Sequence, residues 1–115
     1  MIVCAPRLLR LLTGSFVRAI TLFPFILLRD DRDQRNPVLI NHERIHLQQQ
    51  RELWVLPFYF LYLGEYCWGR MQGLNHLQSY LTISFEQEAY HHERNLSYLK
   101  NRPFFASKSY YKKRH

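Results

Sequence analysis

Cysteine is scarce in this chain. Cys4 and Cys67 are the two cysteines among 115 residues, and two do not form the disulfide framework that holds small secreted domains together. A reducing compartment is therefore expected, and we place the protein in the cytoplasm, with membrane association left open. The chain also lacks repeats and low-complexity segments.

Long uninterrupted hydrophobic runs are absent as well. Arg7, Arg10 and Arg18 interrupt the apolar residues of the N-terminus, so no signal peptide is predicted there. The strongest membrane candidate is residues 53–71, but its longest charge-free stretch is twelve residues, contains Pro57 and is followed by Glu65. That length favours a buried or interfacial helix over a membrane span.

Acidic residues are missing from the last sixteen positions. Six of the 16 Lys and Arg residues lie there, which leaves residues 1–99 with ten basic and nine acidic residues. The formal net charge of +7 therefore describes a basic, aromatic C-terminal tail over residues 100–115, and nucleic-acid binding is not favoured. We expect a solvated tail, with contact to an anionic lipid surface or stacking on single-stranded nucleic acid as the alternatives.

The composition is that of one small packed domain. Hydrophobic residues make up 47% of the chain and aromatic residues 16%, which excludes wholesale disorder. We predict a single mainly helical α+β domain over residues 1–99, beginning with a lead-in helix over residues 1–18 that ends in a turn at Gly14 and Ser15. Residues 21–28 are β-branched and aromatic with a proline inside, which indicates an edge strand or hairpin.

Helical spacing dominates the rest of the domain. A charged solvated loop over residues 29–36 is expected to lead into a helix that opens at Pro37 and is capped by Asn36. A second, aromatic-rich helix follows Pro57 and runs to about Met71. A third begins near Ser84 and continues to about residue 99.

The first of these helices carries an HExxH motif, His42-Glu43-Arg44-Ile45-His46. Residues four apart share a helix face, so both imidazoles can reach one metal ion. Glu43 lies beside that ion, where it can take a proton from a water molecule that the metal activates. The motif therefore predicts a zinc site with Glu43 as general base.

A catalytic zinc site needs a third protein ligand. Glu86 and Glu88 stand on the later helix, and because they are two residues apart only one of them can point at the metal. The helix spacing leaves both open as candidates.

The segments HERIHLQQQ and SFEQEAY together resemble small zincin-type (gluzincin) metallopeptidase-like domains of mostly uncharacterised bacterial proteins. In these domains an HExxH helix is followed by a helix with an ExxA pattern. The resemblance covers about residues 21–94. It implies that Glu86 is the third zinc ligand, and that Tyr90 stands where many relatives have an aspartate that supports a ligand.

The resemblance further implies a zinc metallopeptidase that hydrolyses peptide bonds. The strand before the motif, with Thr21, Leu22 and Phe23, would pair with an extended peptide or protein substrate. Tyr80, Tyr90 and His91 are the candidates for a group that stabilises the oxyanion.

Two other interpretations remain open. The domain could keep the zincin fold and bind peptides with weak or no turnover. Alternatively, the HExxH motif could be accidental, in a basic helical protein that associates with a membrane or with nucleic acid. Residues 54–68 contain a block of aromatic side chains: Trp54, Phe58, Tyr59, Phe60, Tyr62, Tyr66 and Trp68. We expect them to pack in the core, and any that the core cannot bury to contact a membrane interface or a partner protein.

Overall fold

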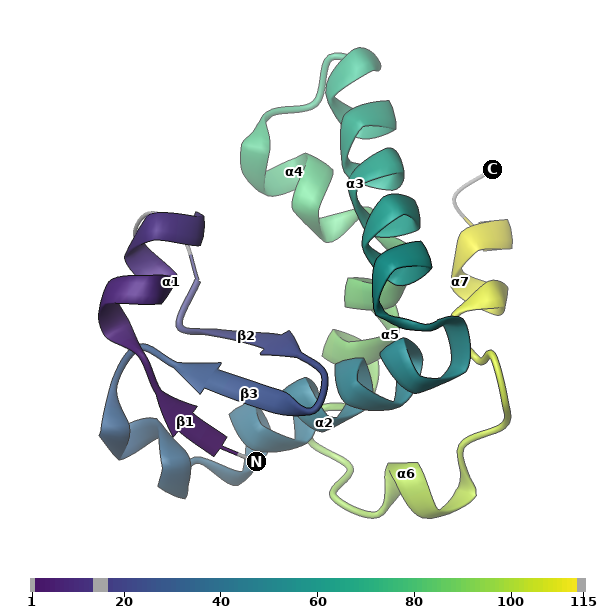
Figure 1. Cartoon of the computed structure of the whole chain (residues 1–115). Helices are drawn as coiled ribbons and strands as arrows, with labels where there is room; N and C mark the ends of the chain where they lie inside the picture. The colour runs from purple at the N-terminus through teal and green to yellow at the C-terminus, as the bar shows by residue number, and fades with distance from the viewer. Residues whose placement is uncertain (1, 14–16, 114–115) are drawn as a thin grey trace.

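The computed structural model describes residues 2–13 and 17–113 (Figure 1). Its strands are β1 (Ile2–Cys4), β2 (Ala19–Leu22) and β3 (Phe25–Leu28). Its helices are α1 (Pro6–Thr13), the short 3-10 helix η1 (Asp31–Arg35), α2 (Pro37–Leu53), α3 (Val55–Met71), α4 (His76–Leu81), α5 (Ser84–His92), α6 (Tyr98–Asn101) and α7 (Lys108–Lys113). The predicted mainly helical α+β class is confirmed.

The three strands form one small sheet in the order β1-β3-β2. β2 and β3 are an antiparallel hairpin that turns at Phe23 and Pro24, with Leu22 opposite Phe25. Of the two forms expected for residues 21–28, the hairpin is the one present, because a proline without an N–H suits a turn better than a ladder position. β2 lies at the edge, and β3 is central and largely buried.

The N-terminal segment differs from the single lead-in helix expected over residues 1–18. Ile2–Cys4 instead pairs in parallel with β3, with Ile2 opposite Ile26. The helix starts only at Pro6, since proline suits the first helical position and the preceding β-branched residues favour a strand. The turn expected at Gly14 and Ser15 lies outside the described residues.

The charged segment before α2 is also more ordered than expected. It forms η1, and Asp33 is buried and accepts hydrogen bonds from the Arg18 guanidinium. This ion pair ties η1 to the start of β2, so the segment is a short helix anchored at Asp33, while its other side chains are largely exposed, as expected.

α2 begins as predicted and forms the centre of the molecule. Pro37 is its first residue, and the Asn36 side chain accepts a hydrogen bond from the Leu39 N–H at 3.2 Å. On the side toward the sheet, Ile40 packs with Ala19, Ile26 and Leu28. The opposite side faces α5, as Figure 1 shows.

α3 and α4 form a helical hairpin that rises away from α2 (Figure 1). The two helices approach closely at Gly69, where a Cβ atom would lie 3.1 Å from Ser79. At the base of the hairpin Phe58 packs with Ile83 and Phe85 in a second core cluster. Among the described helices, none combines the length and hydrophobicity needed to cross a membrane.

α5 ends at His92, earlier than the sequence predicted. The chain then turns into α6, and packed structure continues past residue 99. Arg102, which the sequence assigns to a solvated tail, is buried and pairs with Glu88 and with Glu52 at 2.7 Å. α7 then packs against α5. Residues 100–113 are therefore built onto the domain.

Candidate metal centre

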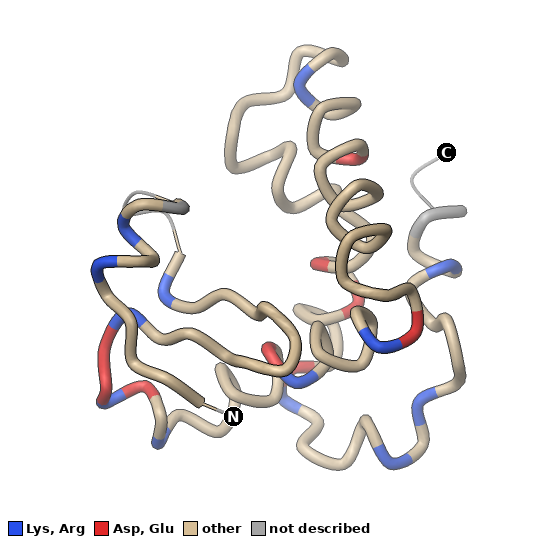
Figure 2. Tube along the Cα trace, viewed as in Figure 1, with Lys and Arg blue, Asp and Glu red and all other residues tan. Residues whose placement is uncertain are grey.

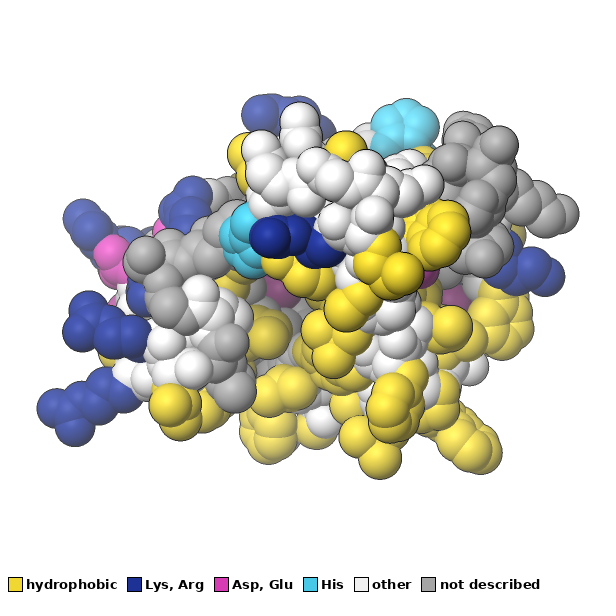
Figure 3. Space-filling view, turned by 90° about the horizontal axis from the view of Figure 1, so that it is seen from above, with side chains coloured by type: hydrophobic (Ala, Val, Ile, Leu, Met, Phe, Trp, Pro, Cys, Tyr) yellow, Lys and Arg dark blue, Asp and Glu magenta, His cyan; other side chains and the backbone are white. Residues whose placement is uncertain are grey.

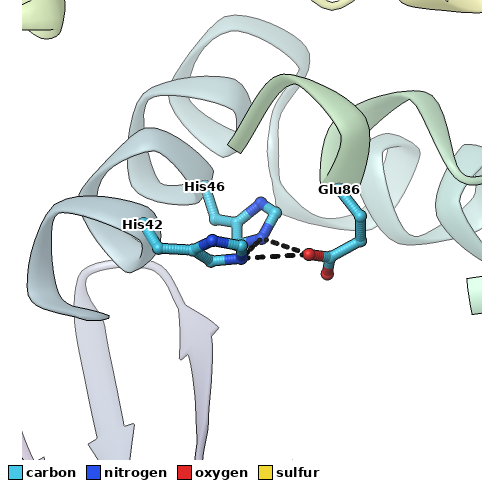
Figure 4. A group of neighbouring side chains, drawn as sticks. All are labelled: His42, His46 and Glu86. Atoms are coloured by element: carbon cyan, nitrogen blue, oxygen red, sulfur yellow. Dashed lines mark hydrogen bonds and ion pairs between the residues drawn. The ribbon is translucent and has the colours of Figure 1, made fainter. Parts of the chain in front are cut away.

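Two histidines from consecutive turns of α2 point to the same place (Figure 4). The Nε2 atoms of His42 and His46 lie 3.2 Å apart, and both residues are 5% exposed. The i, i+4 spacing of the motif therefore has the geometric consequence that the sequence predicted.

Glu86 is the carboxylate that meets them. Its Oε1 lies 3.0 Å from His42 Nε2 and 3.1 Å from His46 Nε2, so the three side chains form a group of candidate metal ligands. Glu88 points away and accepts hydrogen bonds from Arg102 and Tyr98. Of the two candidates on this helix, the structure brings Glu86 to the histidines.

The far side of each imidazole bonds an oxygen acceptor. His42 Nδ1 lies 2.9 Å from Glu93 Oε1, and His46 Nδ1 lies 2.8 Å from Gln49 Oε1. The Gln49 amide is oriented by its NH₂ group, which donates to the Phe85 carbonyl and to Glu88. Each Nδ1 therefore carries a proton, and each Nε2 is directed at Glu86, where it either offers its lone pair or carries a second proton.

This arrangement favours a proton or a metal ion at its centre. Two imidazole lone pairs and a carboxylate oxygen, all acceptors, lie within hydrogen-bond distance of one another, which is unfavourable unless a proton or a metal ion lies between them. Tetrahedral zinc with bonds of about 2.0–2.1 Å holds its ligand atoms about 3.3 Å apart. The observed separations of 3.0–3.2 Å are close to that value, so the donor set fits such an ion.

Without a metal, the shifted pKa values of His46 and Glu86 also favour a positive charge within the cluster. Burial lowers the pKa of His46, but the negative charge of Glu86 and its hydrogen bond outweigh burial and raise the pKa to about 9. Burial likewise raises the pKa of Glu86, and the two histidines outweigh it, so that this carboxyl titrates well below its usual range.

Tyr62 adds a contact that the sequence did not single out for the site. Its hydroxyl donates to Glu86 Oε2 at 2.5 Å, so the oxygen that does not face the histidines is also held. Tyr62 belongs to the aromatic block. The signal in the sequence that could have placed it near the site is its spacing of four residues from Phe58, which puts both on one side of the helix.

Glu43 lies beside the three ligands but does not join them. Its Oε2 is 4.0 Å from His42 Nε2, and its Oε1 accepts a 2.8 Å hydrogen bond from the Thr21 hydroxyl of β2. Burial raises the pKa of Glu43 despite the opposing effect of the two histidines. A buried carboxylate with a raised pKa is a good proton acceptor.

A cleft of about 330 Å³ opens onto this group. Its floor includes Glu43, His46 and Glu86, one wall includes Ala19 and Ile20 of β2, and the other wall is formed mainly by side chains of α3 and α4. Tyr59, Tyr62, Leu63 and Tyr66 line the α3 side. The walls are mostly apolar but include tyrosines and His76, and the two carboxylates, Glu43 and Glu86, lie at the floor.

The edge of β2 is partly occupied by the protein itself. Gln50 of α2 donates to the Thr21 carbonyl at 2.8 Å and accepts from the Phe23 N–H at 2.7 Å, as a residue of a neighbouring strand would. The Tyr59 hydroxyl also donates to the Thr21 carbonyl. At Thr21, Leu22 and Phe23, the segment expected to pair with substrate, these outward main-chain groups are therefore already bonded.

The three candidate oxyanion residues lie in different places. Tyr80 lines the cleft and its hydroxyl lies 3.0 Å from that of Tyr90. The Tyr90 ring packs edge-on against His42, with ring centroids 4.5 Å apart. His91 bonds Tyr110 of α7 at 2.7 Å. The structure thus brings both tyrosines to the edge of the site and His91 to the packing of α7.

Glu93 takes the supporting contact that the resemblance assigns to the position of Tyr90. It lies seven residues after Glu86, which places both on one side of a helix. Asn41 holds the local backbone by donating to the carbonyls of His92, Glu93 and Asn95. Glu93 was not among the site residues predicted from the sequence, and its seven-residue spacing from Glu86 is the signal that could have found it.

Comparison with known proteins adds no neighbour to this description. No family model, curated protein or solved structure matches the chain.

Proposed function

We propose that the protein is a zinc-dependent hydrolase of peptide bonds with a small zincin-like fold. The observation that carries the proposal is the convergence of His42 Nε2, His46 Nε2 and Glu86 Oε1 on one buried point. Two imidazoles and one carboxylate are a ligand set of catalytic zinc, which leaves a position for water.

Each ligand has a partner that fixes its orientation. Glu93 and Gln49 bind the Nδ1 atoms of the two histidines, and Tyr62 binds the second oxygen of Glu86. Such outer contacts set the tautomer and the angle of the ligands and raise metal affinity. When bound in such a site, zinc acidifies a water molecule and polarises a carbonyl oxygen.

Glu43 accepts the proton in this proposal. Its carboxylate lies next to the ligands, is buried, and has a raised pKa. The Thr21 hydroxyl holds Oε1, which leaves Oε2, the oxygen nearer His42, available for the proton. A proton taken from water at Oε2 can be returned to the leaving amine, as general acid–base catalysis of peptide hydrolysis requires.

The cleft supports a peptide as the substrate class. A volume of about 330 Å³ with apolar walls suits a short peptide segment with apolar side chains next to the cleaved bond. Phe58, Ile83 and Leu63 supply apolar surface to the walls, and no Lys or Arg is among the described residues that line the cleft.

The test combines metal content with turnover. Wild-type protein, Glu43→Gln and the matched control Asp31→Asn are purified without chelator, analysed for zinc, and assayed against a library of fluorogenic peptides. Asp31 is exposed and lies on η1, so its variant makes the same change of charge far from the ligands. We expect about one zinc per chain in all three proteins and loss of turnover in Glu43→Gln alone.

Two results would contradict the proposal. Wild-type protein that takes up no zinc has no such site. Turnover that survives in Glu43→Gln at the wild-type rate removes Glu43 from the chemistry.

The second candidate function is a zinc-bearing peptide-binding module without turnover. The self-bonded edge of β2 favours it, because Gln50 and Tyr59 occupy main-chain groups that an extended substrate would need. This function predicts that wild-type protein binds zinc and peptides but cleaves none of the library.

A further inference from the structure

The outer face of α3 carries an uninterrupted row of apolar side chains. Leu56, Phe60, Leu63, Cys67 and Met71 follow the i, i+4, i+7, i+11, i+15 spacing of one helix face, and all five are exposed. We call these residues the outer stripe. Phe60 and Met71 are 76% and 78% exposed, so the stripe contributes little to the core of this chain.

The space-filling view shows the same feature. In Figure 3 hydrophobic side chains gather along the lower side of the molecule, which is the side of α3 that faces the reader in Figure 1. Trp54 at the start of α3 and Trp68 near its end are also exposed. Tryptophan favours the boundary between an apolar phase and water.

Charge on the molecular surface is almost entirely positive. Of the nine acidic residues, all described, Asp31 is exposed and Asp30, paired with Arg32, has a partly exposed side chain, whereas eleven described Lys and Arg residues are exposed. The near-neutral sum over residues 1–99 hides this, because most of the acidic side chains are buried. Figure 2 shows where the acidic and basic residues lie along the chain trace. α3 and α4 together contain one acidic residue, the buried Glu65.

We propose that the outer stripe docks onto an anionic lipid bilayer, lying in its interface and not spanning it. The apolar stripe supplies the inserted surface, and exposed arginines near both ends of α3, Arg51 and Arg70, supply attraction to anionic headgroups. A second copy of the chain is the less favourable occupant, because two cationic surfaces repel each other.

Docking of this kind places the cleft beside the membrane. Leu63 belongs to the outer stripe and also lines the cleft. Peptide segments that emerge from a bilayer would therefore meet the cleft directly. The docking itself does not depend on the metal centre, so it stands or falls separately from the proposed hydrolysis.

The two cysteines provide a matched pair of probes. Cys67 lies on the outer stripe, and Cys4 is exposed on β1, away from it. An environment-sensitive fluorophore is attached at Cys67 in Cys4→Ser and at Cys4 in Cys67→Ser. Vesicles of phosphatidylcholine with about one third phosphatidylglycerol are then added. We expect a blue shift and a rise in emission at Cys67 and little change at Cys4.

Vesicle flotation of paired variants tests the energetics. Leu56→Gln/Phe60→Gln removes one leucine and one phenylalanine from the stripe, and Leu96→Gln/Phe104→Gln removes the same two residue types, similarly exposed, elsewhere. Burying two such side chains corresponds to at least about a hundredfold in affinity. We expect that loss in the stripe variant only, and about a fivefold loss for Arg70→Gln.

Circular dichroism and thermal unfolding establish that each variant is folded. Folded wild-type protein that fails to bind the anionic vesicles overturns the proposal. Equal losses in the two double variants, or an emission change at Cys4 and not at Cys67, show that another surface docks. A stable dimer that only the stripe variant dissociates assigns the stripe to a second copy and also overturns the proposal.

Discussion

The contact between His42 and Glu93 allows the metal centre to be tested away from the ligands. Glu93 Oε1 accepts the His42 Nδ1–H at 2.9 Å and its side chain is 20% exposed. Removal of such a supporting partner costs about 10- to 100-fold in metal affinity, or about 1.4–2.7 kcal/mol. We predict that Glu93→Ala weakens zinc binding within that range.

Glu93→Gln separates the charge from the hydrogen bond. The amide oxygen can still accept from His42 but carries no negative charge, so its effect is expected at the lower end, about tenfold. Asp31→Asn removes an equal charge from an exposed carboxylate on η1 and should leave zinc affinity unchanged. Zinc affinity should therefore decrease in the order Asp31→Asn, Glu93→Gln, Glu93→Ala.

The assay is competition for zinc with a chromophoric chelator of known affinity. Thermal unfolding of each metal-free variant shows whether the fold is retained. If folded Glu93→Ala binds zinc as tightly as wild-type protein, the carboxylate does not orient a ligand and the reasoning about the outer contacts is refuted.

Three further predictions concern other parts of the structure. Gln50→Ala/Tyr59→Phe should free the Thr21 carbonyl and the Phe23 N–H and tighten binding of extended peptides, as measured by fluorescence anisotropy; unchanged affinity would mean that β2 does not bind peptide. Arg102→Met leaves the carboxylates of Glu88 and Glu52 buried without their partner, which should lower the free energy of unfolding by about 3–5 kcal/mol in urea; a change below about 1 kcal/mol would show that the pair is solvated. His46 must lose its proton to bind zinc, and its pKa in the metal-free protein is about 9. Zinc affinity should therefore fall about tenfold for each pH unit below that value, and calorimetry at neutral pH should show about one proton released per zinc bound. Zinc binding that is independent of pH would contradict the protonated cluster.

The features that the sequence predicts well are set by neighbouring residues. The start of α2 depends on Asn36 and Pro37, whose capping and fixed φ act within one turn. The convergence of His42 and His46 follows from their spacing on one helix. Helical geometry also restricted the third ligand to one of Glu86 and Glu88, but could not choose between them.

The features that the sequence missed depend on residues far apart in the chain. Glu93 meets His42 across 51 positions, and Arg102 meets Glu52 across 50. Local periodicity carries no information about such pairings. β1 was missed because its partner, β3, lies beyond a helix, and three residues are too few for an alternating pattern.

The central claim is that His42, His46 and Glu86 hold one zinc ion. Anomalous diffraction at the zinc edge, from crystals of wild-type protein grown with zinc, tests it most directly. The account predicts one buried peak about 2.0–2.1 Å from both Nε2 atoms, with Glu86 Oε1 as the third protein ligand. Well-ordered crystals that show no peak there, or a peak bound by other residues alone, would contradict it.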